Sequence, residues 1–175
     1  LLEKISFTRV SGSELEFQCA NILKNTVESL GGEALVCPFE VSGYKIKKAS
    51  LTANGKSYEV SGIKGSGNAN ITAPLYYMET NLDTDKYEIK DKIVLINGVI
   101  NVPTYKKLLK YGAKGFISYS GDITDKPSNS DLENKELRDV LRNKGIIPGV
   151  HMRTKTAIEL LNDNPKEVTL ELSQD

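Results

Sequence analysis

The sequence predicts an α/β protein of the α+β kind, with a β-rich hairpin portion followed by a βαβ portion. Three short apolar runs, at 92–97, 115–119 and 146–152, alternate with helical patterns, which is typical of strands joined by crossover helices. Upstream of them, Asn54-Gly55 separates two segments of period-two alternation. This dipeptide favours a tight hairpin, because both turn residues need positive φ. An amphipathic helix near the amino terminus precedes both portions.

That helix is expected at residues 13–30, where apolar side chains recur at helical spacing on one face. Ser13 and Glu16 form a capping box, in which the hydroxyl accepts from a free backbone amide and the carboxylate returns to the cap. Gly31-Gly32 ends the helix, because glycine adopts the left-handed conformation at least cost. The apolar stripe consists of Leu15, Cys19, Ile22, Leu23, Val27 and Leu30.

The remaining elements follow from local patterns. Residues 34–41 predict an edge strand, in which Pro38 is tolerated although it has no amide to donate. Thr154 is expected to cap the last helix, at 155–162. The other expected strands are 45–53, 56–60, 71–78 and 168–172, the other helices are 102–111 and 132–143, and the expected loops are 61–70 and 125–131.

Composition excludes several classes of partner. The 175 residues carry 23 basic and 23 acidic side chains, so the charge favours neither nucleic acid nor an anionic membrane surface. No apolar run is long enough to span a bilayer. Because the chain begins at Leu1 and not at a methionine, we expect that residues before Leu1 have been removed. A removed signal peptide would leave no trace in this sequence. Cys19 and Cys37 are expected to be buried free thiols, with a disulfide as the alternative.

The chain has one histidine, His151, which restricts its catalytic chemistry. No His-x-Asp, His-Glu-x-x-His or Cys-x-x-Cys spacing is present, so we expect no metal ligand and no catalytic residue. A site made of carboxylates alone suits zinc poorly. Nucleophilic catalysis needs the histidine at a cleft, whereas His151 lies inside an apolar strand, where we expect it to bond to backbone or solvent.

Two weaker signals are expected to be structural. The glycine-rich segment 62–67 lacks the strand and helix that flank a phosphate-binding loop, so a flexible connector is expected there. Two acidic clusters are expected to be solvated loops that bind Ca²⁺ weakly at most. They contain Asp83 and Asp85, and Asp131 and Glu133.

The βαβ portion resembles a protease-associated domain. The run Asp-Lys-Ile-Val-Leu-Ile-Asn at 91–97 is similar to the "GKIVLV" strand of that family, and Tyr-Gly-Ala-Lys-Gly-Phe-Ile-Ser-Tyr at 111–119 to its "AGAKGVIIY" strand. Residues 147–152 resemble the "IPAVGI" strand, and 154–161 the helix that follows it. Spacing and order agree across about half of the chain.

The amino-terminal segment carries a second motif, Phe-Thr-Arg-Val-Ser-Gly-Ser-Glu at 7–14, and Gly31-Gly32 follows the next helix. This arrangement resembles the "R-x-x-GS-E" start of zinc aminopeptidases, a family that includes leucyl aminopeptidases, aminopeptidase Y and glutamate carboxypeptidase. Residues 39–51 resemble the entry into an inserted protease-associated domain. The resemblance implies that 1–44 is a helix–strand segment of a peptidase catalytic domain and that 45–175 is the inserted domain.

Together the two resemblances imply a non-catalytic fragment of a zinc-dependent aminopeptidase, a hydrolase whose inserted domain acts as a lid that limits which peptides enter the active site. Zinc is then expected only in the full-length parent, because the family's first zinc-binding histidine follows the inserted domain, beyond Asp175. The implied partners are the catalytic domain of the parent and a peptide substrate. The chain alone is predicted to be inactive.

The substrate-contacting residues are expected after the second parallel strand, because ligands of α/β sheets favour the carboxyl ends of strands. This places Tyr119, Ser120, Gly121 and Asp122 at the contact surface, with a plain solvent loop as the alternative. A free-standing module that binds protein partners is the second functional hypothesis, but it would not need the amino-terminal helix. A flavodoxin-like enzyme is disfavoured by the hairpin and by the lack of a phosphate loop.

The apolar stripe of the 13–30 helix is expected to be covered, because an apolar face in water costs about 25 cal/mol per Å². It would dock onto its own domain or onto a second copy of the chain, as a homodimer. The lack of a disulfide pattern leans towards a cytoplasmic parent. Many relatives are secreted, so the compartment stays open.

Overall fold

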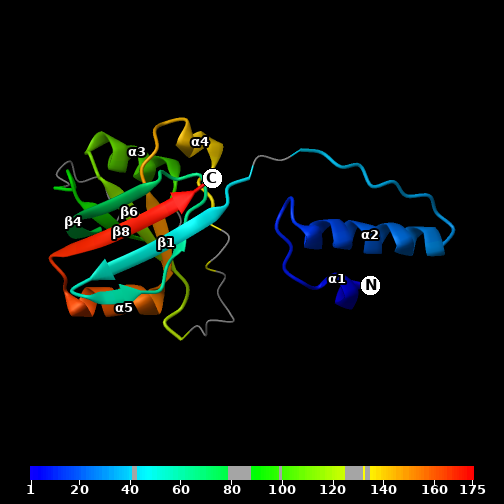
Figure 1. Ribbon diagram of the computed structural model, residues 1–175, viewed down its shortest axis with the longest axis horizontal. Helices are drawn as coiled ribbons and strands as arrows, with labels where there is room; N and C mark the ends of the chain where they lie inside the picture. The colour runs from blue at the N-terminus through cyan, green and yellow to red at the C-terminus, as the bar shows by residue number, and fades with distance from the viewer. Residues whose placement is uncertain (41–42, 79–87, 99, 125–131, 133–134) are drawn as a thin grey trace. The chain divides into compact units, whose positions relative to one another are not determined.

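The computed structural model describes residues 1–40, 43–78, 88–98, 100–124, 132 and 135–175 (Figure 1). The chain divides into two compact units, Leu1–Gly43 and Tyr44–Asp175, called unit 1 and unit 2 below. Unit 2 contains a mixed eight-stranded sheet with helices on both faces, which confirms the predicted α/β class. None of the described helices combines the length and apolar character that a membrane span requires.

Unit 1 consists of the short helix α1 (Leu2–Ile5) and the longer α2 (Glu14–Ser29). As predicted, the Ser13 hydroxyl accepts from the backbone amide of Glu16, at 3.3 Å. The Glu16 carboxylate accepts from the amide of Gly12 at 2.6 Å, one residue before the expected partner. Cys19 is buried, whereas most of the apolar stripe is exposed. The exposed fractions are 46% for Leu15, 41% for Leu23, 42% for Val27 and 83% for Leu30.

The strand expected at 34–41 is not formed over 34–40, the part that the structure describes. A β-strand is held by backbone hydrogen bonds to a neighbouring strand, and no described strand pairs with this segment. Leu35 and Phe39 are accordingly exposed. Cys37 is exposed as well, so the expectation of two buried thiols is wrong for this residue, and both cysteines are free.

The sheet of unit 2 has the strand order β2-β1-β8-β4-β5-β6-β7-β3. Strands β4, β5, β6 and β7 are parallel to one another, and every other pair in the sheet is antiparallel. The strands are β1 (Ile46–Ala53), β2 (Lys56–Tyr58), β3 (Ser61–Gly62), β4 (Ala69–Met78), β5 (Ile93–Asn97), β6 (Gly115–Ser120), β7 (Gly149–Arg153) and β8 (Glu167–Gln174).

The hairpin and the proline of β4 both follow from local chemistry. Asn54 and Gly55 have φ values of 52° and 77°, which confirms the predicted turn. Strand β4 pairs with β8 up to Pro74 and with β5 from Leu75 onward. Pro74 is therefore the last residue of β4 that pairs with β8, and the pairing with β5 begins at the next residue. Proline is tolerated at such a position, although it has no backbone amide to donate.

Helices α3 (Val102–Lys110) and α4 (Asp139–Arg142) cover one face of the sheet, and α5 (Thr154–Asp163) covers the other (Figure 1). Successive side chains of a strand point to opposite faces, so each parallel strand contributes to two cores. In β5, for example, Val94 and Ile96 join the core under α3 and α4, while Ile93 and Leu95 join the core over α5.

Three local predictions are corrected. The helix expected at 132–143 is reduced to α4, because residues before it extend along Lys64: the Lys64 amide donates to the Lys135 carbonyl, and the Leu137 amide donates to the Lys64 carbonyl. The loop expected at 61–70 contains β3 and the start of β4. Thr154 is the first residue of α5, not its cap, and its hydroxyl donates to the Gly121 carbonyl at 2.7 Å. The loop at 125–131 and the acidic residues Asp83, Asp85, Asp131 and Glu133 lie outside the described residues.

Candidate functional site at the carboxyl edge of the parallel strands

The alternation of strand β6 separates the four predicted contact residues. Tyr119 points into the core over α5, where it is 7% exposed, and its hydroxyl lies 3.2 Å from that of Tyr77. Burial, and then the hydrogen bond to Tyr77, raise the pKa of the Tyr119 phenol well above its usual value. Ser120 points to the opposite face, towards His151. The four residues therefore do not form one surface.

The other two predicted residues lie in the turn after β6 and are exposed. The Gly121 carbonyl accepts from the hydroxyl of Thr154. The Asp122 carboxylate accepts from the amide of Thr124 at 2.8 Å and from its hydroxyl at 2.7 Å. These hydrogen bonds lower the pKa of the Asp122 carboxyl. A role of these residues in substrate binding stays a prediction.

His151 is the centre of a buried polar cluster on the α3/α4 face. It is 4% exposed, its Nδ1 lies 2.8 Å from the Ser118 hydroxyl, and its Nε2 lies 3.1 Å from the Ser120 hydroxyl. Ser118 is its direct neighbour in the β6–β7 ladder, and Ser120 is two residues further along the same face. The expectation that His151 bonds to backbone or solvent is therefore wrong, because its partners are two side chains of the adjacent strand.

The environment of His151 makes it a neutral residue and a poor base. Burial, followed by the nearby positive charge of Lys135, lowers the pKa of the imidazole to about 4. A general base works best with a pKa near the working pH. Both ring nitrogens are engaged by serines, and no hydrogen bond links the ring to a carboxylate within the described part of the chain. This arrangement therefore lacks the acid that orients the histidine of a catalytic triad.

A cavity of about 200 Å³ opens beside His151. It lies at the carboxyl edge of β5 and β6, where ligands of α/β sheets are usually bound. Its wall is partly apolar, with polar groups on the sheet side and on the segment before α4. The lining residues are Ile63, Gly98, Ile100, Phe116, Ser118, Lys135, Glu136, Leu137, Arg138, Leu141 and His151.

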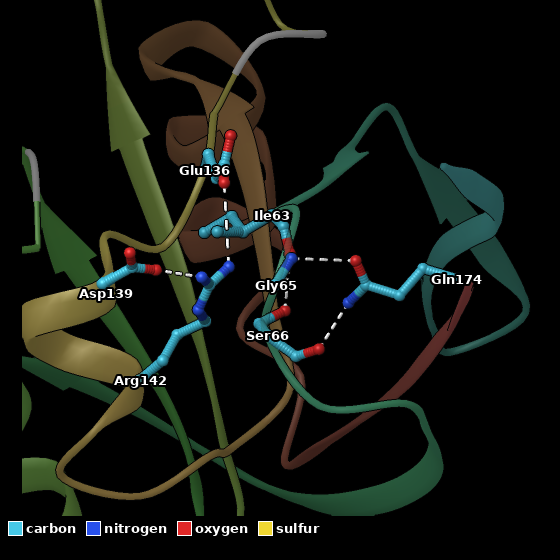
Figure 2. A network of polar contacts seen from close by, with 7 residues as sticks. All are labelled: Ile63, Gly65, Ser66, Glu136, Asp139, Arg142 and Gln174. Carbon is cyan, nitrogen blue, oxygen red and sulfur yellow. Dashed lines mark hydrogen bonds and ion pairs between the residues drawn. The ribbon is translucent and has the colours of Figure 1, made fainter. Parts of the chain in front are cut away.

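A polar network holds the two segments that border this cavity (Figure 2). From the end of β8, the Gln174 side chain accepts from the Gly65 amide at 2.9 Å and donates to the Ser66 carbonyl. On the other segment, Arg142 forms ion pairs with Glu136, at 3.7 Å, and with Asp139. The side chains of Arg142 and Gln174 thus fix the loop after β3 and the segment before α4 from two sides.

The glycine-rich segment 62–67 was expected to be a flexible connector, and hydrogen bonds within the same network show that this expectation is wrong. The amide of Gly65 donates to Gln174, that of Ser66 to the Ile63 carbonyl, and that of Gly67 to the Ile147 carbonyl. The segment is thus held in place, and its amides are already engaged, so it does not form a phosphate cradle. Among the described residues, no group of three His, Cys, Asp or Glu side chains is arranged to hold a metal ion.

Neither a family model nor a curated protein sequence matches this chain. Among solved structures it is similar to BSAP, a zinc aminopeptidase from Bacillus subtilis, with a TM-score of 0.71 and 24% identity. That alignment covers 99% of this chain and 41% of BSAP. A peptidase M28 precursor from Shewanella amazonensis SB2B gives a TM-score of 0.66 at 17% identity, covering 99% of this chain and 46% of the precursor.

A third similar structure belongs to a different class of protease. The psychrophilic subtilisin-like protease Apa1 from Pseudoalteromonas sp. AS-11 gives a TM-score of 0.53 at 21% identity, covering 75% of this chain and 33% of Apa1. The chain thus spans less than half the length of each of these three proteins. At these identities the comparisons establish the fold.

Proposed function

We propose that this chain is the non-catalytic, amino-terminal part of a zinc-dependent aminopeptidase, and that unit 2 is its protease-associated domain. The observation that carries the proposal is the match of 99% of the chain to 41% of a zinc aminopeptidase, across both units. The motif order of the sequence supports it independently, because residues 7–14 and 91–119 resemble the corresponding segments of that family.

The likeness to Apa1 supports an accessory role for unit 2. A zinc peptidase activates water with a metal, whereas subtilisin uses a Ser-His-Asp triad. A fold found in both classes would serve something other than the bond-breaking chemistry. The Apa1 match covers 75% of this chain, about the share that unit 2 occupies. We infer that unit 2 acts as a lid that limits the access of peptides to the active site.

Unit 1 would then belong to the catalytic domain of the parent enzyme. Its helix α2 has a capped start and an apolar stripe of which Leu15, Leu23 and Val27 are each more than 40% exposed. Apolar side chains arranged on one face of a helix are typical of packing against a sheet or another helix. The catalytic domain is the proposed partner of this stripe. Ser120, Gly121 and Asp122 form the proposed rim that meets the peptide.

A free-standing protein-interaction module is the second candidate. One observation favours it: both hydrophobic cores of unit 2 consist of residues from 46 onward, so this unit buries its own apolar side chains without unit 1. Such a module folds and binds without a catalytic domain. The two candidates differ in whether peptide hydrolysis depends on unit 2.

Three measurements test the proposal. The purified chain should not hydrolyse leucine p-nitroanilide, with or without added zinc, and chelator-sensitive turnover would contradict a non-catalytic role. The product of the complete gene should hydrolyse the same reporter in a zinc-dependent manner. In that enzyme, Asp122→Asn should change KM for a decapeptide but leave KM for the reporter unchanged. A complete gene product without aminopeptidase activity would favour the interaction module.

A further inference from the structure

The cavity beside His151 has the size and wall of a small-ligand site. Its volume of about 200 Å³ lies below the roughly 300–1,000 Å³ of pockets for drug-sized molecules, so its ligand would be smaller. Part of the wall is apolar and can hold a short hydrocarbon group. The apolar lining residues are Ile63, Ile100, Phe116, Leu137 and Leu141.

The charged part of the wall favours an anion. Lys135 and Arg138 are cationic, and the acidic Glu136 is already paired with Arg142. Within the part of the chain that the structure describes, the ion pairs include neither Lys135 nor Arg138. Lys135 lines the cavity together with Ser118 and His151, and its positive charge contributes to the lowered pKa of the imidazole. A cationic ligand would be repelled there, and an anion would be attracted.

Ser118 and His151 can supply a hydrogen bond to such an anion. A neutral imidazole has one donor nitrogen and one acceptor nitrogen. When the proton is on Nδ1, the ring donates to the Ser118 oxygen and accepts at Nε2 from the Ser120 hydroxyl. The Ser118 hydrogen is then available to the cavity that this residue lines. The nearby amide of Leu137 is engaged by the Lys64 carbonyl, so the donors come from side chains.

We propose that this cavity binds a small carboxylate with a short hydrocarbon group, whose carboxylate is held by Lys135 and Ser118 and whose hydrocarbon group is held by the apolar wall. The four elements of the argument are independent of the peptidase assignment: the volume, the apolar wall, the excess positive charge and the Ser118 hydroxyl. The site lies on the α3/α4 face, apart from the exposed turn at Gly121 and Asp122.

The chain offers a direct probe, because His151 is its only histidine and gives a single imidazole Hε1 signal by NMR. The probe ligand is 4-methylpentanoate, titrated at pH 7 into the full chain. Its matched analogues are 4-methylpentan-1-ol, which is neutral, and 4-methylpentan-1-amine, which is cationic. The carboxylate should shift the His151 signal in a saturable manner, with a dissociation constant on the order of 1–10 mM for a ligand of this size. The alcohol should bind about tenfold more weakly, and the amine should not bind.

Two variants test the named contacts. Lys135→Gln should weaken carboxylate binding about tenfold or more, as expected for the loss of a hydrogen bond to a charged group. Lys110→Gln removes the same charge outside the cavity and should leave binding unchanged. Ser118→Ala should also weaken binding, and amide spectra establish whether it folds. Lys135 is only half-buried, so the Lys135→Gln variant is expected to fold and tests the proposal if Ser118→Ala does not fold.

Three outcomes would overturn the proposal. The first is no saturable shift with the carboxylate. The second is equal binding of the alcohol, which would show that charge does not select the ligand. The third is equal binding of inorganic phosphate, which would show that the apolar wall contributes nothing.

Discussion

Lowering the pH from 7 to 5 is expected to destabilise the wild-type protein by about 2 kcal/mol more than a His151→Asn variant. The folded protein holds His151 at 4% exposure, and burial lowers its pKa from 6.5 to about 4. In the unfolded chain the same imidazole takes up its proton near pH 6.5. Between these values the unfolded state binds more protons, so stability falls as the pH falls.

The magnitude follows from the gap between the two pKa values. Each pKa unit corresponds to about 1.4 kcal/mol, so the full effect below pH 4 is about 3 kcal/mol, of which about 2 kcal/mol has appeared at pH 5. The other charged groups that line the cavity beside His151 are Lys135, Glu136 and Arg138, and all three are retained in the variant. Asparagine cannot titrate, yet it can still bond to a serine.

The assay is urea unfolding followed by far-ultraviolet circular dichroism at pH 7, 6 and 5, for both proteins. The carboxylates titrate in both proteins, so their contribution cancels when the free energy of unfolding of one protein is subtracted from that of the other at each pH. Titration of the His151 imidazole proton by NMR in the folded chain gives the pKa directly. A folded-state pKa near 6.5, or the same pH dependence in both proteins, would refute the reasoning that burial keeps this residue neutral.

Two further predictions concern packing and exposure. Gly149→Ala should destabilise the protein by about 1–3 kcal/mol, measured by urea unfolding, because the added methyl group would overlap the fully buried ring of Phe116. Combining it with Phe116→Leu should cost less than the sum of the two single changes, and strict additivity would contradict the overlap. Cys37 should react with Ellman's reagent in the native protein, while Cys19, at 4% exposure, should react only on opening of its helix. Equal rates for the two thiols would show that Cys19 is not protected.

The sequence predicted best where neighbours along the chain decide the structure. The Asn54-Gly55 turn needs only two residues with positive φ, and Ser13 with Glu16 caps α2 through amides of the same turn. The buried strands β5 and β6 were evident from continuous apolar runs. Predictions that needed a distant partner were less successful. The segment 34–40 has strand-like residues, but no described neighbour pairs with it.

In the candidate site, too, local features were predictable and contacts with distant residues were not. The position of Tyr119 to Asp122 after a parallel strand was predictable, but the burial of Tyr119 depends on which face of β6 meets α5. The serine hydroxyl partners of His151 were not predicted. A signal was present, since Ser118 and Ser120 are the polar residues at alternate positions of an otherwise apolar strand.

By itself, the sequence determined the fold class, the order of most elements and the presence of a single histidine, because these depend on local periodicity and composition. Only the tertiary structure decided what surrounds that histidine. The β6–β7 register places Ser118 beside His151, and the extended segment at Lys135 and Leu137 places a cation and an apolar wall over both. Register and loop path depend on contacts between residues more than thirty positions apart, whereas local periodicity indicates only which residues share a face of a strand or helix.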